Sequence, residues 1–293
     1  MQPGTIITTD AIEAAQDGGA LLLDVRLAED FEEAHLPNAV NNCAFEVAFA
    51  ERLADAAPDR DLPVIVYGAG GESHESRLAA DKLLRLGYEQ VLDYRDGLAG
   101  WQETGREIVT GKAAPSAPDA PHGRREVDLS ESQVEWTGRN LLNKHWGSVG
   151  LKGGHLEFDS GTLAGGEFVL DLTALRCHDL EGEMHDVLIA HLQSDDFFDV
   201  GRFPEARYAI HSSKPLGDGT AGRPNLHLEG ELTLRGETHP LAIEAVTGLA
   251  PDGRPAAQAT LALNRTVWGS IYGSAGFFQR LGMHLVNDLV DLE

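Results

Sequence analysis

A glycine-rich run directly after a short apolar segment is the first place where this sequence could do chemistry. Residues 64–67 read Val-Ile-Val-Tyr, which is typical of a buried strand, and the residues that follow are Gly68, Ala69, Gly70, Gly71, Glu72, Ser73 and His74. A turn of this kind between a strand and a helix directs backbone N–H groups toward one point, where an anion can bind. We therefore expect residues 68–74 to form an anion-binding loop, with a purely structural turn as the alternative.

The end of this run offers a nucleophile, a base and an acid in Ser73, His74 and Glu75. Neighbouring residues on a helix point in different directions, whereas a working triad is assembled in space from distant positions. We therefore interpret Ser73 as the cap of the following helix. Asp24 and Arg26 come directly after another apolar segment, and we expect them to support the loop through an internal ion pair, with Arg26 as a lining residue as the alternative.

A second group of reactive side chains is rich in histidine and cysteine. It comprises His145, Cys177, His178, His185 and His191. Imidazole and thiolate groups are zinc ligands, but the spacing matches neither CxxC nor HExxH. Adjacent residues on a strand also point to opposite faces, so Cys177 and His178 cannot easily bind one ion. We expect no metal and no other cofactor, and a histidine-rich metal site stays open as an alternative.

The elements that must position these residues change character near residue 112. Before it, short apolar segments alternate with helical patterns, which predicts an α/β domain with a parallel sheet over residues 1–111. Residues 112–125 begin with a stretch rich in proline and alanine and are interpreted as a linker. In residues 126–293 helical periodicity almost vanishes and apolar residues alternate with a period of two. About eight antiparallel strands are expected there, closed into a barrel or packed as a sandwich.

Length, charge and composition exclude several classes of protein. A chain of 293 residues suggests two domains at roughly 150 residues each. The net charge of −24 repels phosphate backbones, so nucleic acid is not an expected partner. The apolar runs are far shorter than the roughly 20 residues that span a bilayer, so we expect no membrane span. The residues Met1–Gly4 lack the start of a secretory signal, and the two cysteines cannot form a disulfide framework, which favours a cytoplasmic protein.

Several segments of the first domain resemble the signatures of rhodanese domains. They are residues 24–26, 35–40, 64–67 and 97–101. The resemblance implies a loop in which a cysteine directly after Tyr67 carries sulfur as a persulfide. Gly68 takes that position, and Ser73 takes the place of a second cysteine that some relatives have. We therefore expect no thiosulfate sulfurtransferase activity and an anion-binding or interaction module, with a homodimer and sulfur transfer through Cys43 as open alternatives.

The second domain resembles the YceI-like family. The resemblance rests on residues 127–138, 191–200, 203–204, 230–236 and 264–269. It implies a lipocalin-like antiparallel β-barrel whose apolar interior binds a polyisoprenoid, a quinone or a fatty lipid. Leucines at a period of two, interrupted by Gly165, Gly166 and Gly230, would leave room for a slender ligand. The alternative is that the same leucines fill a solid core.

The family resemblance also implies which side chains contact the ligand. His145 and His191 fall at positions where the family has histidine, and Arg265 and Trp268 lie in its late motif. We expect these residues to contact the ligand in the interior or at its mouth. The alternative is that each caps a turn or satisfies a buried carbonyl group. The predicted function is that of a lipid-binding or carrier protein.

Overall fold

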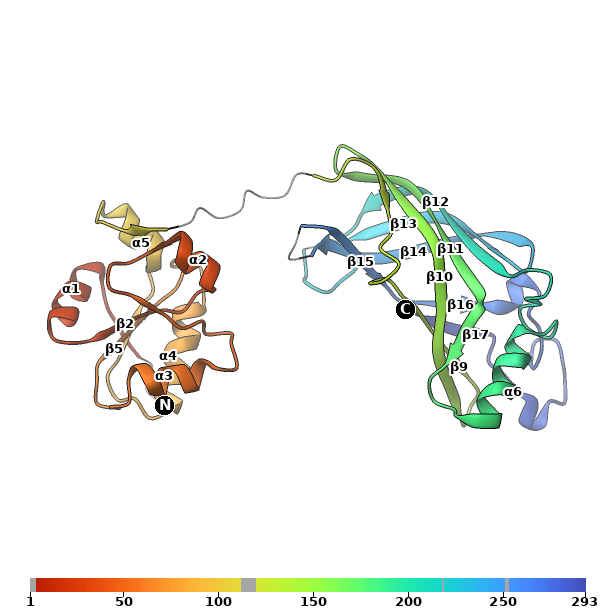
Figure 1. Cartoon of the computed structure of the whole chain (residues 1–293), viewed down its shortest axis with the longest axis horizontal. Coiled ribbons are helices and arrows are strands. Elements are labelled where there is room, and N and C mark those ends of the chain that lie inside the picture. The colour runs from red at the N-terminus through yellow and green to blue at the C-terminus, as the bar shows by residue number, and fades with distance from the viewer. Residues whose placement is uncertain (1–3, 112–119, 218, 251–252) are drawn as a thin grey trace. The chain divides into compact units, whose positions relative to one another are not determined.

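The chain forms two compact units, Met1–Ser116 and Ala117–Glu293 (Figure 1). The computed structural model describes residues 4–111, 120–217, 219–250 and 253–293. Residues 112–119 of the expected linker lie outside the described residues. Its residues 123–125 already belong to a strand of the second unit, because β8 begins at Gly123. Each unit has a hydrophobic core of its own.

The first unit is an α/β structure built on a parallel sheet, as the sequence predicts. Its elements are β1 (Thr5–Ile6), α1 (Thr9–Asp17), β2 (Leu21–Asp24), α2 (Ala28–Glu33), β3 (Ala34–His35), β4 (Val40–Asn41), α3 (Phe49–Ala56), β5 (Val64–Tyr67), α4 (Glu75–Arg85), β6 (Val91–Tyr94), α5 (Gly97–Glu103) and β7 (Val109–Thr110). The main sheet has the order β1-β6-β5-β2-β4, and all of its pairs are parallel. The short strands β3 and β7 form a separate antiparallel pair.

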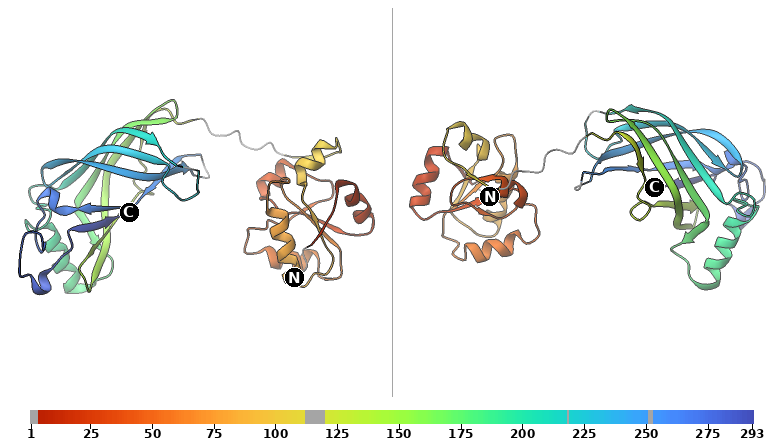
Figure 2. Two further views of the ribbon diagram at one scale, coloured as in Figure 1. Left: turned by 180° about the vertical axis from the view of Figure 1, so that it is seen from behind. Right: turned by 45° about the horizontal axis from the view of Figure 1, so that its top comes forward.

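Helices lie on both faces of the sheet (Figure 2), and alternate residues of the central strand β5 pack against the two sets. Val64 and Val66 belong to the cluster that contains the apolar residues of α3 and α4. Ile65 and Tyr67 belong to the cluster that contains those of α1 and α5. All residues of β5 are buried, which explains why the strand reads as one continuous apolar run. The carboxyl end of this strand delivers the chain into the glycine-rich loop.

The second unit is an antiparallel barrel with one long helix. Its elements are β8 (Gly123–Glu126), β9 (Val134–Arg139), β10 (Lys144–Asp159), β11 (Thr162–Cys177), α6 (Gly182–Gln193), β12 (Glu205–Pro215), β13 (Leu226–Leu234), β14 (Glu237–Leu249), β15 (Pro255–Ala259), β16 (Leu261–Asn264), η1 (Arg265–Trp268), η2 (Gly282–His284) and β17 (Leu289–Leu292). The sheet order is β15-β14-β13-β12-β11-β10-β9-β17-β16, and β8 pairs with β10.

The two ends of this sheet meet in one stretch of chain. β15 pairs with β14, β16 pairs with β17, and only Thr260 separates β15 from β16. The sheet is therefore nearly closed into a barrel, as expected. It contains 10 strands rather than about eight. The short strand β8 and the division of one stretch into β15 and β16 account for the difference.

Helix α6 is an element that the sequence did not predict. It lies at one end of the barrel (Figures 1 and 2). None of its residues is fully buried, although Leu188, Ile189 and Leu192 pack against the barrel core. The barrel covers only part of one side of α6. Such a helix needs no strong apolar stripe, so its apolar residues follow the helical period only weakly. Within the described ranges no helix is long and apolar enough to cross a membrane.

Candidate functional site

The loop that follows β5 is held against the start of α5. The N–H of Leu98 donates to the carbonyl oxygen of Gly68 at 3.0 Å, and the N–H of Ala99 donates to that of Ala69 at 2.9 Å. Gly97 has a φ of 61° and lies so close to this loop that a Cβ atom would meet the Gly68 oxygen. Only glycine satisfies both requirements at position 97. The loop backbone is therefore fixed from a distant part of the chain.

The carboxylate of Glu75 occupies the centre of this loop. Its Oε2 accepts a hydrogen bond of 2.7 Å from the N–H of Ala69. A Cβ atom at position 68 would overlap the Glu75 side chain, so this carboxylate fills the space that a side chain on Gly68 would take. The N-cap of α4 is His74 rather than Ser73, whose hydroxyl accepts from the N–H of Glu75 at 3.3 Å. Ser73 therefore lies one residue before the N-cap, and the side chain of His74 makes no capping hydrogen bond.

Asp24 and Arg26 form a buried ion pair beside the loop. Arg26 Nη2 lies 2.6 Å from Asp24 Oδ2 and also donates to the carbonyl oxygen of Ala34 at 2.6 Å. Burial lowers the pKa of Arg26, but the hydrogen bond and the charge of Asp24 outweigh it and raise the pKa. Burial, followed by the charge of Asp24, raises the pKa of Tyr67, whose hydroxyl accepts from the N–H of Leu36 at 3.0 Å. These bonds anchor residues 34–36 to the strand ends.

The two cysteines of the chain lie away from the glycine-rich loop in the sequence and are both free thiols. Cys43 follows β4 (Val40–Asn41) and has no accessible surface. A sulfur-carrying thiol must be reached by its substrate and is normally exposed in part. The burial of Cys43 therefore favours a packing role.

The apolar residues of the barrel interior keep more accessible surface than most core residues of the first unit. Most apolar core residues of the first unit, including Val64 and Leu83, are 0% exposed. Every buried apolar residue of the second unit retains between 2% and 9% exposure. Further inward side chains, such as Leu241 and Ile243, are only partly buried against the same core. Side chains of a close-packed core lose nearly all accessible surface, so this interior is packed less tightly.

The glycines expected to make room for a ligand do not all do so. A Cβ atom on Gly230 would meet the ring of Tyr208 at 2.8 Å, so that ring fills the room. The Tyr208 hydroxyl donates to the Leu241 oxygen at 3.0 Å, and burial raises the pKa of Tyr208 to about 12. Gly165 and Gly166 lie against backbone oxygens of neighbouring strands. The expectation is therefore wrong for these glycines, because side-chain or backbone atoms of the barrel wall take their space.

His191 lies on α6 in an aromatic cluster at one end of the barrel. Its Nε2 is 3.2 Å from Asp196 Oδ2, and its ring packs edge-on against Phe197 and Tyr272, with centroids 4.9 and 4.6 Å away. The Tyr272 hydroxyl is 3.3 Å from Nδ1 of His284. The cluster joins α6 to the segment between η1 and η2. No periodic or motif signal points to Tyr272 or His284, because the first lies in a turn and the second in a short 3-10 helix.

His145 lies at the start of β10 in a separate polar group. Its Nδ1 is 2.9 Å from Oδ2 of Asp179. Oδ1 of Asp179 accepts from the N–H of Trp146 at 2.9 Å and from the thiol of Cys177 at 3.3 Å. Burial raises the pKa of Asp179, but the hydrogen bonds from Trp146, His145 and Cys177 outweigh it and lower the pKa. Asp179 thus ties the start of β10 to the end of β11.

Arg265 and Trp268, which are expected to contact a ligand, are both buried and have their polar groups bonded to backbone oxygens. Arg265 is 1% exposed, and its guanidinium donates to backbone oxygens of Ser270, Tyr272, Val286 and Asn287. Burial lowers the pKa of Arg265. The indole of Trp268 donates to the Leu232 oxygen at 2.9 Å and is 3% exposed. Both residues thus fit the alternative expectation, that their side chains satisfy buried carbonyl groups.

The histidine-rich region offers no metal centre in the part of the chain that the structure describes. No three histidine, cysteine, aspartate or glutamate side chains form a group that could hold an ion there. Instead His145, His185 and His191 each contact one carboxylate, and His178 contacts the Ser148 hydroxyl. His178, His185 and His191 are close in sequence because α6 follows the end of β11, yet their side chains contact different partners.

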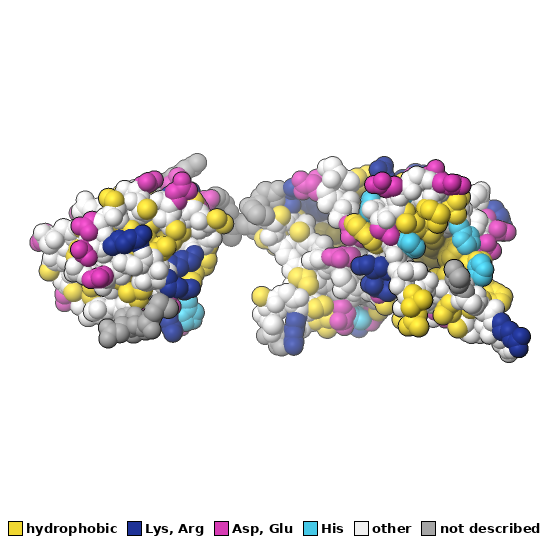
Figure 3. Space-filling view, turned by 90° about the horizontal axis from the view of Figure 1, so that it is seen from below, with side chains coloured by type: hydrophobic (Ala, Val, Ile, Leu, Met, Phe, Trp, Pro, Cys, Tyr) yellow, Lys and Arg dark blue, Asp and Glu magenta, His cyan; other side chains and the backbone are white. Residues whose placement is uncertain are grey.

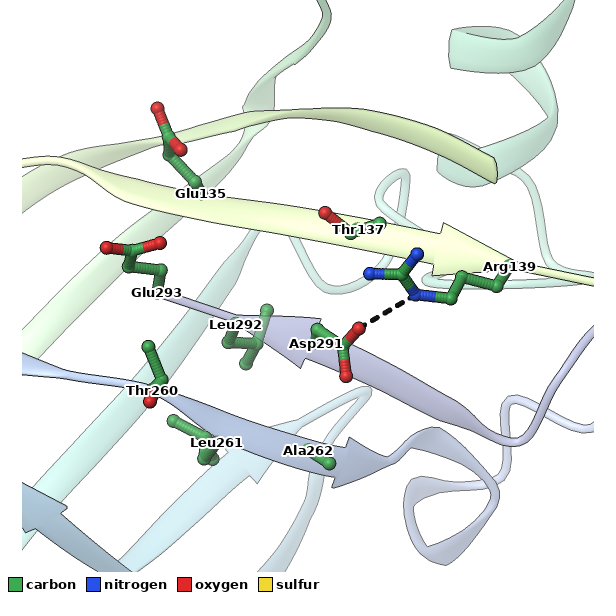
Figure 4. Close-up of a pocket in the computed structure, with 9 residues that line it drawn as sticks. All are labelled: Glu135, Thr137, Arg139, Thr260, Leu261, Ala262, Asp291, Leu292 and Glu293. Atoms are coloured by element: carbon green, nitrogen blue, oxygen red, sulfur yellow. Dashed lines mark hydrogen bonds and ion pairs between the residues drawn. The ribbon is translucent and has the colours of Figure 1, made fainter. Parts of the chain in front are cut away.

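A surface depression of about 430 Å³ lies where β9, β16 and β17 meet (Figure 4). Its lining residues are Glu135, Thr137, Arg139, Thr260, Leu261, Ala262, Asp291, Leu292 and Glu293. Arg139 Nε and Asp291 Oδ2 form an ion pair of 2.9 Å across it. Trp136, between the outward residues of β9, points inward to the core. A lining with this many charges does not suit an apolar ligand.

Comparisons with known proteins assign both units. Residues 8–104 match the rhodanese-like domain and residues 126–293 the YceI-like domain. YibN of Escherichia coli is 31% identical over 94 residues, which are 32% of this chain and 63% of YibN. Thiosulfate sulfurtransferase GlpE of Pseudomonas savastanoi is 30% identical over 98 residues, 33% of this chain and 87% of GlpE.

The second unit is similar to a UPF0312 protein of Pseudomonas fluorescens, with 34% identity over 86 residues that cover 28% of this chain and 43% of that protein. The crystal structure of BcnA from Burkholderia cenocepacia aligns with a TM-score of 0.44 and 18% identity, over 57% of this chain and 95% of BcnA. The chain thus spans less than two thirds of YibN and of the UPF0312 protein. Because the YceI-like match covers more than half of its residues, the chain belongs to the YceI-like family, and it carries a rhodanese-like domain ahead of the barrel.

Proposed function

We propose that the barrel binds and carries an isoprenoid or another elongated amphiphilic lipid in its interior. The observation that carries this proposal is the residual accessibility of every buried apolar side chain in the barrel, whereas most core residues of the first unit have no accessible surface. Membership of the YceI-like family supports the same ligand class. Binding of this kind needs an apolar space and a few polar contacts, and it needs no catalytic group.

The energy for such binding comes from apolar surface removed from water. At about 25 cal/mol per Å², roughly 330 Å² of buried ligand surface corresponds to the −8.2 kcal/mol of a micromolar complex before ordering costs are subtracted. A few isoprene units present a surface of this order. The side chains available to bury it include Leu226, Leu241 and Ile243, which are all only partly buried in the free barrel.

The polar head of the ligand would be received by the cluster around His191. His191, Tyr272 and His284 place two imidazoles and a phenol beside each other at the α6 end. These groups can donate to a quinone carbonyl or exchange hydrogen bonds with a hydroxyl group. His145, with its ring bonded to Asp179, offers a second polar contact. Arg265 and Trp268 are not part of this proposal, because their polar groups are already bonded within the protein.

For the first unit we propose an interaction module without thiosulfate sulfurtransferase activity. Gly68 stands directly after β5, where the family resemblance places the cysteine, and the Glu75 carboxylate fills the adjoining space. An external anion would have to displace this carboxylate from the N–H of Ala69. Cys43 is too deeply buried to replace the missing thiol. Self-association of this unit to a homodimer remains part of the interaction proposal.

The carrier proposal is tested by filling the interior from one strand. Ile243 on β14 points into the barrel, whereas its neighbour Glu244 is exposed on the outside. The full chain is titrated with ubiquinone-10 and decaprenol, and binding is followed by tryptophan quenching. We expect saturable binding that Ile243→Trp weakens at least tenfold and Glu244→Trp leaves unchanged. Equal binding by both variants, or none by the native chain, would refute the proposal.

A further inference from the structure

The α6 end of the barrel carries a rim of exposed apolar side chains. We propose that this rim docks on the surface of an electrically neutral phospholipid bilayer. It consists of Leu141, Leu142, Met184, Val187, Phe277 and Phe278. Leu141 and Leu142 are each 87% exposed, and the others range from 44% at Phe278 to 62% at Met184. An exposed apolar group of this size on one end of a domain indicates an interaction surface.

The three segments that supply the rim are joined at the same end of the barrel. Leu141 and Leu142 lie in the turn between β9 and β10, and the Asn287 N–H donates to the oxygen of Arg139, the last residue of β9, at 2.8 Å. The ring contact of 4.6 Å between His191 and Tyr272 joins α6 to the segment that contains Phe277 and Phe278. Figure 3 shows hydrophobic side chains gathered around a hollow on this face, with histidines beside it.

The opposite end of the barrel lacks such a rim. Its described connections, between β8 and β9, β10 and β11, β12 and β13, and β14 and β15, expose only Leu129, Leu216 and Leu249 among large apolar side chains, and these three do not form one run. The β10–β11 turn, for example, consists of Ser160 and Gly161. Exposed apolar side chains at one end of the barrel do not add to the stability of the fold. They are expected when one end faces an apolar partner.

The charges beside the rim select a neutral surface. Residues 139–144, 179–193 and 270–284 cover the three segments. Their basic residues are Arg139, Lys144 and Arg280, and their acidic ones are Asp179, Glu181, Glu183 and Asp186. The balance is 3 − 4 = −1, on a chain whose net charge is −24. An anionic bilayer would therefore repel the protein, whereas a zwitterionic bilayer accepts leucine and phenylalanine side chains at the level of its head groups.

This inference rests on the proposed function, since a lipid carrier must exchange its cargo with the membrane that contains it. The polar cluster of His191 and Tyr272 lies at the same end as the rim. Docking through the rim would thus place this end of the barrel against the bilayer, so that the hydrocarbon chain need not cross water. The cost of exposing an isoprenoid during transfer would be avoided.

Vesicle flotation of the full chain tests the docking. Neutral phosphatidylcholine vesicles are compared with anionic vesicles in which roughly 30% of the lipid is phosphatidylglycerol. We expect the native chain to float with the neutral vesicles and less with the anionic ones. The double variant Leu141→Ser, Leu142→Ser should lose at least four fifths of the floated fraction, whereas Leu249→Ser at the other end should float as the native chain does.

Absence of native flotation, or equal flotation of the double variant, would overturn the proposal. Light scattering that shows a dimer lost in the double variant would also overturn it and assign the rim to a second copy of the chain. Lipid extraction from each purified protein separates the two proposals. A lipid-loaded chain that does not float contradicts the docking alone, whereas a chain that floats but neither contains nor takes up lipid contradicts the carrier function alone.

Discussion

Replacement of Arg265 by methionine separates a structural role of this residue from a ligand contact. Its guanidinium binds four backbone oxygens, at 3.0 Å for Asn287, 2.5 Å for Ser270, and 2.8 and 3.2 Å for Tyr272 and Val286. These oxygens belong to residues on both sides of the irregular segment between η1 and β17. Arg265→Met keeps much of the aliphatic volume and removes all of these bonds.

The magnitude follows from what the substitution leaves behind. Each oxygen that stays buried without a donor costs about 1–3 kcal/mol, although water can reach some of them once the segment loosens. Asp288, whose Oδ1 is 3.9 Å from Arg265 Nη2 and has no hydrogen bond, would lose its nearby cation. We therefore expect a loss of about 3 kcal/mol in the free energy of unfolding of the barrel.

Hydrogen–deuterium exchange of the full chain measures this loss locally. At about 3 kcal/mol, protection of the barrel amides should fall more than a hundredfold, with residues 265–288 affected first. Arg265→Lys should fall between the native chain and Arg265→Met, because one ammonium group replaces part of the donor set. Unchanged exchange in Arg265→Met together with lost lipid retention would refute the structural role and return Arg265 to the ligand site.

Three further outcomes are expected. Cyanide and thiosulfate should give thiocyanate only at the background rate with the native chain and with Cys43→Ala, and turnover that the variant lacks would contradict the buried, inactive thiol. Gly68→Cys should be destabilising because its side chain meets Glu75; Glu75→Ala should relieve this by about 0.5–3 kcal/mol in a double-mutant cycle, and additive effects would contradict the overlap. The folded-state pKa of Asp179 lies below its ordinary value of 3.8. Its carboxylate therefore stabilises the fold at neutral pH and loses this effect as the pH falls below that value, so Asp179→Asn should be less stable than the native chain at pH 7 and nearly equal to it at about pH 2, as urea denaturation can show.

Local patterns predicted the parts of the fold that depend on local rules. The continuous apolar run of β5 and the glycine-rich turn after it identified a buried strand and its loop, because a strand buried on both faces needs only apolar residues. The alternation of Leu226, Leu228 and Leu232 identified the inner face of β13, as all three pack into the barrel core. The class of each unit followed from these periods.

Features that depend on contacts between distant parts of the chain could not be predicted from the sequence. Helix α6 was missed because the barrel covers it only in part, so its apolar period is weak. Gly230 was interpreted as empty space, whereas Tyr208 from the neighbouring strand fills it. Arg265 was interpreted from its place in a family motif, and only the fold shows that carbonyl oxygens surround it. Glu75 received no role of its own in the loop, because its approach to Ala69 depends on the turn of the chain between them.

Native mass spectrometry of the chain, purified without added lipid, tests the carrier function most directly. The proposed function predicts an adduct on the 31.5 kDa chain that organic extraction releases as an isoprenoid, a quinone or a fatty lipid. The adduct should be absent from Ile243→Trp and present in Glu244→Trp. A bare chain that also fails to take up decaprenol would contradict a lipid-binding interior.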